Sequence, residues 1–386
     1  MSRRQTEFAN APHASAAMER HQKQAARVLC AVMAALAALA CIFLVTGYGK
    51  GSIATASGTS AVSPASADDP FYVLLIGSDS RKGTALYTGV PGEHAQIDQH
   101  ADALTLMRVD PQGYLITLVT VPPNTVLTGE TRPLSYTLMD NDPQNTVNAV
   151  EQLTGVSISY YMLTGFSGFE GIVDQLGSVT VDVDVTVKGQ DPLTAKNVVV
   201  KSGDNRKLLA SGALAFARAW GEYPSDNAVH RQANIRALEV AIIKKVLGMD
   251  EGTALAAAST LGASVFTNMG TTLMNNLVAK FADQGAGQVT VYQCTGPDTV
   301  TDKAKGYVAQ DAVAWDQLMY VVDRGYDPAR SYESVQAEEE QKAAAEEAAQ
   351  QNAGQYTYQN DTWYGTRQES SVAHGQYSQQ QSTGGN

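Results

Sequence analysis

A run of 22 residues without a charged side chain lies between Arg27 and Lys50, with the sequence VLCAVMAALAALACIFLVTGYG. An α-helix of that length spans about 33 Å, which matches the roughly 30 Å hydrocarbon core of a bilayer. The run therefore predicts a transmembrane helix over residues 28–49. A chain that carries such a helix places its folded part on one side of a membrane.

The charges that flank this run predict its orientation. Only Lys50 follows it closely, whereas five cations precede it: Arg3, Arg4, Arg20, Lys23 and Arg27. The positive-inside rule places residues 1–27 in the cytoplasm, as a tail, and the remainder outside the cell membrane. A cleavable signal peptide is the alternative, because residues 65–67 read ASA. We favour an uncleaved, single-pass signal anchor, since that motif follows the apolar run by about 20 residues and the run is long for a signal peptide.

Composition changes divide the rest of the chain. Residues 50–69 are small and polar and predict a flexible linker. Residues 70–330 alternate strand-like and helix-like segments, and the chain is 44% hydrophobic, which supplies a sizeable core. Residues 331–352 predict a solvated helix, and residues 353–386, rich in Gln, Ser and Tyr, predict a disordered tail. Aromatic residues in that tail could bind sugars, although we favour a spacer.

The order of elements predicts an α/β fold, a single external αβα domain with a mixed central sheet. Residues 71–76 are apolar and rich in aromatic and β-branched types, as in a strand buried on both faces. Residues 103–109 and 114–121 predict a hairpin, and residues 178–187, which alternate valine with polar residues, predict an edge strand. The predicted helices cover 145–155, 169–177, 207–220, 227–248 and 312–325, and one further strand covers 288–294.

The first predicted strand ends in a polar cluster of Ser78, Asp79, Ser80 and Arg81. In an open α/β sheet, ligands bind in the crevice beyond the carboxyl ends of the strands. The cluster therefore marks the mouth of a binding site, with a solvated turn as the alternative. A nucleic-acid ligand is disfavoured, because the formal net charge is -12 and no basic stripe accompanies it.

Two arginines continue apolar helix faces. Arg231 precedes Ile235 by one turn, on the stripe that runs through Leu238, and Arg218 follows Leu214 by one turn. A guanidinium that points toward the interior needs an anionic partner. That partner is either a ligand or an internal carboxylate, namely Asp79, Asp102 or Asp226.

These residues lie in motifs that resemble the LytR-CpsA-Psr family of bacterial cell-envelope proteins. The resemblance covers residues 70–326, together with the short cytoplasmic tail and the single span. Its motifs are LLIGSDSR, the aspartate of HADALTLMRVD, VPPNT, YYMLTGFSGFEGIVDQLGSVTVDV, LLASGALAFAR and HRQ.

The family resemblance implies a transferase for cell-wall assembly. It moves a glycan phosphate from a polyprenyl pyrophosphate carrier to a peptidoglycan hydroxyl, with the lipid in an apolar groove. It implies Mg²⁺ held by Asp79 and Asp102, and catalytic roles for Asp102, Arg218 and Arg231. The implied pyrophosphate ligands are Arg81, His100, Arg218, Arg231 and Gln232.

The sequence also departs from the family pattern. His100, Pro123, Trp220 and Ala228 stand where the family carries arginine, and Asn124 stands where it carries aspartate. Replacement cations from Arg108, Arg132 or Arg236 are one compensation. A catalytically weakened member that binds polyprenyl phosphate or wall glycan as a scaffold or regulator is the alternative function.

Overall fold

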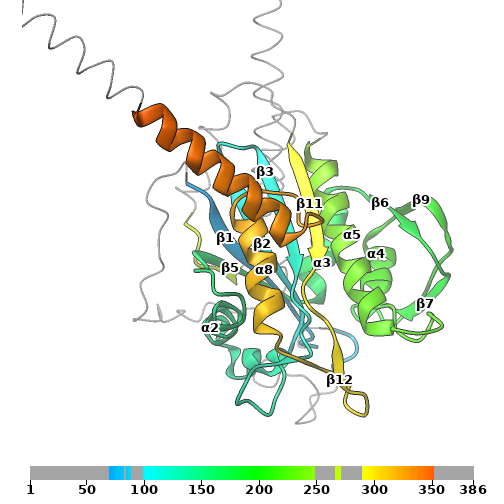
Figure 1. The fold of residues 1–386 in the computed structure, drawn as a ribbon. Coiled ribbons are helices and arrows are strands. Elements are labelled where there is room, and N and C mark those ends of the chain that lie inside the picture. Colours follow the sequence, from blue (N-terminus) through cyan, green and yellow to red (C-terminus); the bar gives the residue numbers. More distant parts are fainter. Residues whose placement is uncertain (1–68, 82–83, 88–98, 248–265, 271–288, 352–386) are drawn as a thin grey trace, which may run out of the picture. The chain divides into compact units, whose positions relative to one another are not determined.

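The computed structural model describes residues 69–81, 84–87, 99–247, 266–270 and 289–351 (Figure 1). The chain divides into two compact units, residues 1–329 and 330–386. The predicted cytoplasmic tail, transmembrane segment and C-terminal tail lie outside the described residues, as does nearly all of the predicted linker. In the described ranges, no helix combines the length and apolarity needed to cross a bilayer.

A mixed six-stranded sheet forms the centre of the first unit, which confirms the predicted α/β domain with a mixed central sheet. Strand β1 pairs antiparallel with β2 and parallel with β5, while β3 pairs antiparallel with β2 and parallel with β11. The sheet order is β10-β5-β1-β2-β3-β11. The strand bounds are β1 Phe71–Ser78, β2 Ala101–Asp110, β3 Leu115–Thr120, β5 Tyr160–Thr164, β10 Phe266–Thr267 and β11 Thr290–Thr295.

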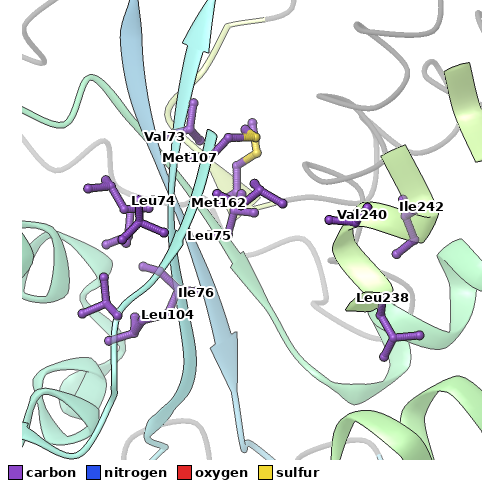
Figure 2. Close-up of a cluster of buried hydrophobic side chains, with 14 of the residues drawn as sticks. Val73, Leu74, Leu75, Ile76, Leu104, Met107, Met162, Leu238, Val240 and Ile242 are labelled. Atoms are coloured by element: carbon purple, nitrogen blue, oxygen red, sulfur yellow. The ribbon is translucent and has the colours of Figure 1, made fainter. Parts of the chain in front are cut away.

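Strand β1 is buried on both faces, as its unbroken apolar run predicts. Figure 2 shows Leu74 and Leu104 on one side of the sheet, and Leu75 and Met107 on the side that faces Leu238 of helix α5. Because successive strand residues point to opposite faces, the six apolar residues of β1 contribute to the core on both sides. The two faces therefore share one hydrophobic core through this strand.

Helices lie on both sides of the sheet. Helix α5, Asn227–Leu247, contacts β2, β3 and β11, and helix α4, Ala210–Ala217, packs against it. Helices α2, Pro143–Thr154, and α8, Ala312–Asp323, contact each other on the opposite side (Figure 1). Helix α3, Phe166–Gln175, packs against α4.

Helix α2 shows why these helices begin and end where they do. The side chain of Asp142 accepts a hydrogen bond from the Gln144 amide, and Pro143 occupies the first turn, where no intrahelical amide donor is needed. Gly155 ends the helix with φ 71°, in the left-handed region that glycine adopts without strain. The predicted helix end at this glycine is confirmed.

The predicted edge strand over residues 178–187 is confirmed in part, because residues 179–183 form a strand with alternating burial in a two-stranded sheet, but the prediction of one continuous strand is wrong. The segment forms two strands, β6 Val179–Val183 and β7 Val187–Gln190, which pair outside the central sheet with β9 Gly203–Leu208 and β8 Asn197–Val200. The β6–β9 register shifts between Val181 and Val183, at the end of β6. Helix α4 begins at Ala210, three residues after the predicted start at residue 207. The first two residues of the predicted helix belong to β9 instead.

Short elements complete the first unit. Strand β4, Thr125–Val126, joins the hairpin of β12 Val300–Asp302 and β13 Tyr307–Ala309, and a 3₁₀ helix, η1, covers Leu134–Asn141. In the second unit, residues 332–351 form a helix whose side chains are mostly exposed. Glu338 forms ion pairs there with Arg330 at 2.8 Å and Lys342 at 3.0 Å.

Candidate functional site

The carboxyl end of β1 is shaped by Gly77. A Cβ atom at this position would lie 2.8 Å from the Cβ of Ala103 on β2, so only glycine fits without movement. The β1–β2 register shifts between Gly77 and Ser78, and this bulge redirects the chain into the polar cluster. Ser78 then donates to the side chain of Gln99 and accepts from the Ser80 amide at 3.0 Å.

Asp79 is held against His100, on the segment that leads into β2. Its carboxylate accepts from the His100 amide at 2.6 Å, and its other oxygen lies 3.2 Å from Nδ1 of the His100 ring. The Asp79 amide donates to the His100 carbonyl at 3.1 Å. The His100 ring packs edge-on against Tyr136 at 4.5 Å between centroids, and Arg132 lies 5.6 Å from the Tyr136 ring.

Arg231, in the first turns of α5, pairs with Asp102 on β2. The Nη2 atom lies 2.8 Å from a carboxylate oxygen of Asp102 and donates to its backbone carbonyl at 2.9 Å. The guanidinium lies 6.0 Å from the ring of Trp220, a side chain that is 59% exposed. The internal ion pair expected as an alternative for these arginines therefore exists for Arg231, with Asp102 as the partner.

Arg218, at the end of α4, has a different environment. It donates to the Gln190 carbonyl at 3.2 Å and lies 4.7 Å above the Phe166 ring, and it forms no ion pair with any residue that the structure describes. Burial lowers the pKa of Arg218, and the positive charges of Arg231 and Arg81 lower it further. Three arginines thus lie close enough to repel one another.

An apolar cavity of about 100 Å³ opens beside these charges. Arg218, Arg231 and Asp102 line it together with the end of β1, Ile76 to Ser78. Its apolar wall comes from Leu75, Phe166, Phe169, Leu214, Ile235 and Leu238. Arginines that offer planar, bidentate donors next to an apolar cavity form a site for an anion that carries an apolar chain.

Other predicted residues lie elsewhere. Gln232 is buried, 6% exposed, and does not line the cavity. Pro123 and Asn124 are held away from it, because the Pro123 carbonyl accepts from the Ser135 amide and the Asn124 amide group donates to the Gly306 carbonyl. Among residues that the structure describes, no group of three or more His, Cys, Asp and Glu could hold a metal ion.

The three proposed replacement cations also have separate positions. Arg108 pairs with Asp110 at 3.2 Å and is nearly fully buried, and Arg236 donates to the Thr120 hydroxyl at 2.8 Å. Of these three arginines, only Arg132 lies near the pair of Asp79 and His100: it lies close to the Tyr136 ring, which packs against the His100 ring.

Sequence reasoning missed Phe166 and Glu239, both of which line the cavity. The signal for Glu239 was present, because it follows Ile235 by one turn and Arg231 by two turns of the same helix.

The fold and the site define a class: α/β domains in which arginines surround the mouth of an apolar cavity. A family model described as the LytR_cpsA_psr family matches residues 44–320. The chain belongs to this family.

Individual relatives agree with the family. A Bacillus mycoides protein named polyisoprenyl-teichoic acid–peptidoglycan teichoic acid transferase TagU is 28% identical over 184 residues, 47% of this chain and 54% of its own. Cell wall biosynthesis protein LcpA of Corynebacterium glutamicum is 23% identical over 302 residues, 68% and 57% of the two chains. This chain therefore spans little more than half the length of these relatives. The crystal structure of B. subtilis TagV shares the fold, with TM-score 0.53, 18% identity, and coverage of 67% and 98%.

Proposed function

We propose that this protein transfers a glycan phosphate from a polyprenyl pyrophosphate carrier to peptidoglycan in cell-wall assembly. The observation that carries the proposal is the position of Arg218 and Arg231 at an apolar cavity, with Arg81 close to them. Arg218, which has no carboxylate partner among the residues that the structure describes, suits a pyrophosphate, because its planar donors match phosphate oxygens in pairs. The names of the relatives TagU and LcpA support the same direction.

The proposed reaction is a substitution at phosphorus. An acceptor hydroxyl oxygen bonds to the phosphorus that carries the glycan, and the phosphoanhydride bond breaks. Polyprenyl phosphate leaves with the electron pair of that bond, and the hydroxyl proton is released. Arg218 and Arg231 stabilise the charge that develops on the phosphate oxygens, and Asp102 orients Arg231 through their 2.8 Å ion pair.

Magnesium is part of the proposal, with Asp79 and Asp102 as its protein ligands. Mg²⁺ is usually bound by one or two carboxylates together with substrate phosphates, and these two aspartates are of the required type. Each already has a cationic or potentially cationic partner, His100 and Arg231. We therefore propose that Asp79 and Asp102 would hold Mg²⁺ together with the pyrophosphate oxygens, and the ion would neutralise phosphate charge there.

The proposed setting is the outer face of the cell membrane. Residues 28–49 would anchor the chain as a single span, with the N-terminus in the cytoplasm and the α/β domain outside. The basis is the uncharged run and the five cations that precede it. A lipid-linked substrate and a membrane anchor restrict enzyme and carrier to the same surface.

The test uses the full-length chain in detergent with a polyprenyl pyrophosphate sugar, Mg²⁺ and peptidoglycan fragments. We expect transfer of the sugar phosphate to peptidoglycan, and a large loss of transfer in Asp102→Ala. Asp182→Ala, which removes an exposed carboxylate on β6, is the matched control and should retain activity. Equal product formation by wild type and Asp102→Ala would refute the proposal.

The second candidate is a member of this family that binds the lipid carrier without transfer. It is favoured by the tethering of Pro123 and Asn124 to η1 and the β12–β13 hairpin, which leaves positions of two family charges outside the cavity. Lipid that co-purifies with the chain, combined with no transfer, would support this candidate. Deletion of residues 331–386 should leave lipid binding intact under both candidates.

A further inference from the structure

The cavity has an almost wholly apolar lining, and a further ionisable residue borders it besides the two arginines and Asp102. Arg231 and Glu239 both line it, and Glu239 lies eight residues further along α5, which is about 12 Å along the helix axis. Ile235 and Leu238, between them, contribute apolar wall. Arg231 and Glu239 thus border the cavity at separate positions along one helix.

Glu239 is buried without complete hydrogen bonding. Its side chain is on a residue 6% exposed, and Oε2 has no hydrogen-bond partner in the part of the chain that the structure describes. The buried hydroxyl of Thr105, which pairs across strands with Leu75 and so lies on the face of the sheet toward α5, is close to Glu239 but outside hydrogen-bond geometry among the described residues. A buried carboxyl group that lacks partners is costly, so its presence beside an apolar cavity needs an explanation.

The surroundings of Glu239 favour its neutral form. Burial raises the pKa of Glu239 to about 7, against the smaller opposing effects of the Thr105 hydroxyl and the Arg236 guanidinium. Burial also raises the pKa of Cys294, near Arg236, to about 12, so this thiol stays neutral. The other charged and titratable groups on α5 and on the elements that pack against it are His230, Arg231, Arg236, Lys244 and Lys245 on α5, Arg218 at the end of α4, Asp102, Arg108 and Asp110 on β2, Asp182 on β6, and Tyr292 and Cys294 on β11.

We propose that Glu239 is a specificity-determining residue that limits how far the apolar chain of an isoprenoid pyrophosphate enters the cavity. This inference rests on the proposed function, because it requires that the pyrophosphate binds at Arg218 and Arg231. An isoprenoid chain that reaches Glu239 places apolar atoms against its carboxyl group. The neutral acid tolerates that contact at small cost, whereas the carboxylate does not.

Two consequences follow for ligands of different length. A ligand that ends before Glu239 gains affinity from the apolar wall at any pH. A ligand that reaches Glu239 binds only the neutral form, so its apparent dissociation constant rises by the inverse of the neutral fraction. With a pKa near 7, that constant rises about tenfold between pH 6 and pH 8.

The experiment compares inorganic pyrophosphate with dimethylallyl, geranyl and farnesyl pyrophosphate on the full-length chain in detergent, by calorimetry from pH 6 to pH 8.5. The affinity relative to dimethylallyl pyrophosphate, compared at each pH, isolates the effect of the longer isoprenoid chain, because the three isoprenoid probes carry the same headgroup, whereas inorganic pyrophosphate has one more titrating proton. We expect the relative affinity of farnesyl pyrophosphate to fall about tenfold between pH 6 and pH 8. In Glu239→Gln it should stay constant for every probe.

Two further variants keep the test decisive. Thr105→Val removes the hydroxyl that favours ionisation, so the fall should move to higher pH. Glu170→Gln removes another buried carboxyl whose pKa is raised to about 7 but which does not line the cavity, so the fall should remain.

The outcomes separate this inference from the function on which it rests. If the affinity gained from the isoprenoid chain depends on pH equally in wild type and Glu239→Gln, the proposed role of Glu239 is refuted. The lipid site of the proposed function would still stand. No gain over inorganic pyrophosphate for any isoprenoid probe refutes both the inference and the lipid site of the proposed function.

Discussion

Replacement of Arg218 by methionine separates a ligand-binding arginine from a structural one. The guanidinium is partly buried, lies near Arg231 and Arg81, and forms no ion pair among the described residues. It donates a hydrogen bond to the Gln190 carbonyl at 3.2 Å. Methionine keeps the contact with the Phe166 ring, since a thioether packs well against aromatic rings. We therefore expect the folded state to lose little when the positive charge is removed.

The magnitude can be worked from these contacts. Loss of one hydrogen bond to a carbonyl costs about 1 kcal/mol, and the removal of like-charge repulsion opposes it, so the free energy of unfolding should change by less than about 1 kcal/mol. A charge-assisted hydrogen bond to the ligand contributes about 1.5 to 3 kcal/mol, so pyrophosphate affinity should fall about ten- to 150-fold. The predicted variant is thus nearly as stable as wild type but binds poorly.

The assay pairs urea unfolding with calorimetric titration of inorganic pyrophosphate. Arg206→Met, which removes an exposed arginine on β9, is the matched control and should leave both quantities unchanged. The reasoning is refuted if Arg218→Met loses several kcal/mol of unfolding free energy while its pyrophosphate affinity stays at the wild-type value. Such a result would make Arg218 a structural residue.

Three other predictions concern stability. In Gly296→Ala the new Cβ would lie 2.2 Å from the buried Trp315 ring, so thermal unfolding should show a loss of stability of about 1 to 3 kcal/mol or more. The control Gly171→Ala, in open space on a helix, should be neutral or stabilising, and equal effects of the two substitutions would contradict the packing at Trp315. Asn124→Asp replaces a donor to a backbone carbonyl with an acceptor, so urea unfolding should show a loss of about 1 to 3 kcal/mol, and an unchanged midpoint would contradict the contact. Burial and a neighbouring aspartate raise the pKa of Glu170 to about 7, above its unfolded value, so its contribution to stability is complete below about pH 4.3 and is lost as pH rises to 7. Glu170→Gln should therefore remove on the order of 3 kcal/mol from the pH dependence of the unfolding free energy. A pH profile identical to that of wild type would contradict this prediction.

Much of the central sheet follows from local sequence. The unbroken apolar run of β1 and the turn between β2 and β3 identify three strands, and Gly155 identifies a helix end. Strand β5 was not predicted, because its five residues lie between two helices and carry no clear alternation. The pairing of β6 with β9 depends on partners more than 20 residues away, so the pattern of alternating valines could not show that it leaves the central sheet.

The site was partly predictable for a similar reason. Helical periodicity places Arg231 on the buried face of α5, and the position of Arg218 follows from one turn of α4. Periodicity gives a direction but no partner, so it could not distinguish the ion pair of Arg231 with Asp102 from the unpaired environment of Arg218. The hydrogen bond from Asn124 to the β12–β13 hairpin likewise joins residues far apart in the sequence.

The central claim is that Arg218 and Arg231 hold the pyrophosphate of a lipid whose chain lies in the adjacent cavity. The most direct measurement is native mass spectrometry of the full-length chain titrated with a polyprenyl pyrophosphate, for wild type and for Arg218→Met combined with Arg231→Met. The account predicts one bound lipid per wild-type chain, and binding weakened by at least about 100-fold in the double variant, since two charge-assisted contacts are lost. Equal lipid occupancy in the two proteins would contradict it.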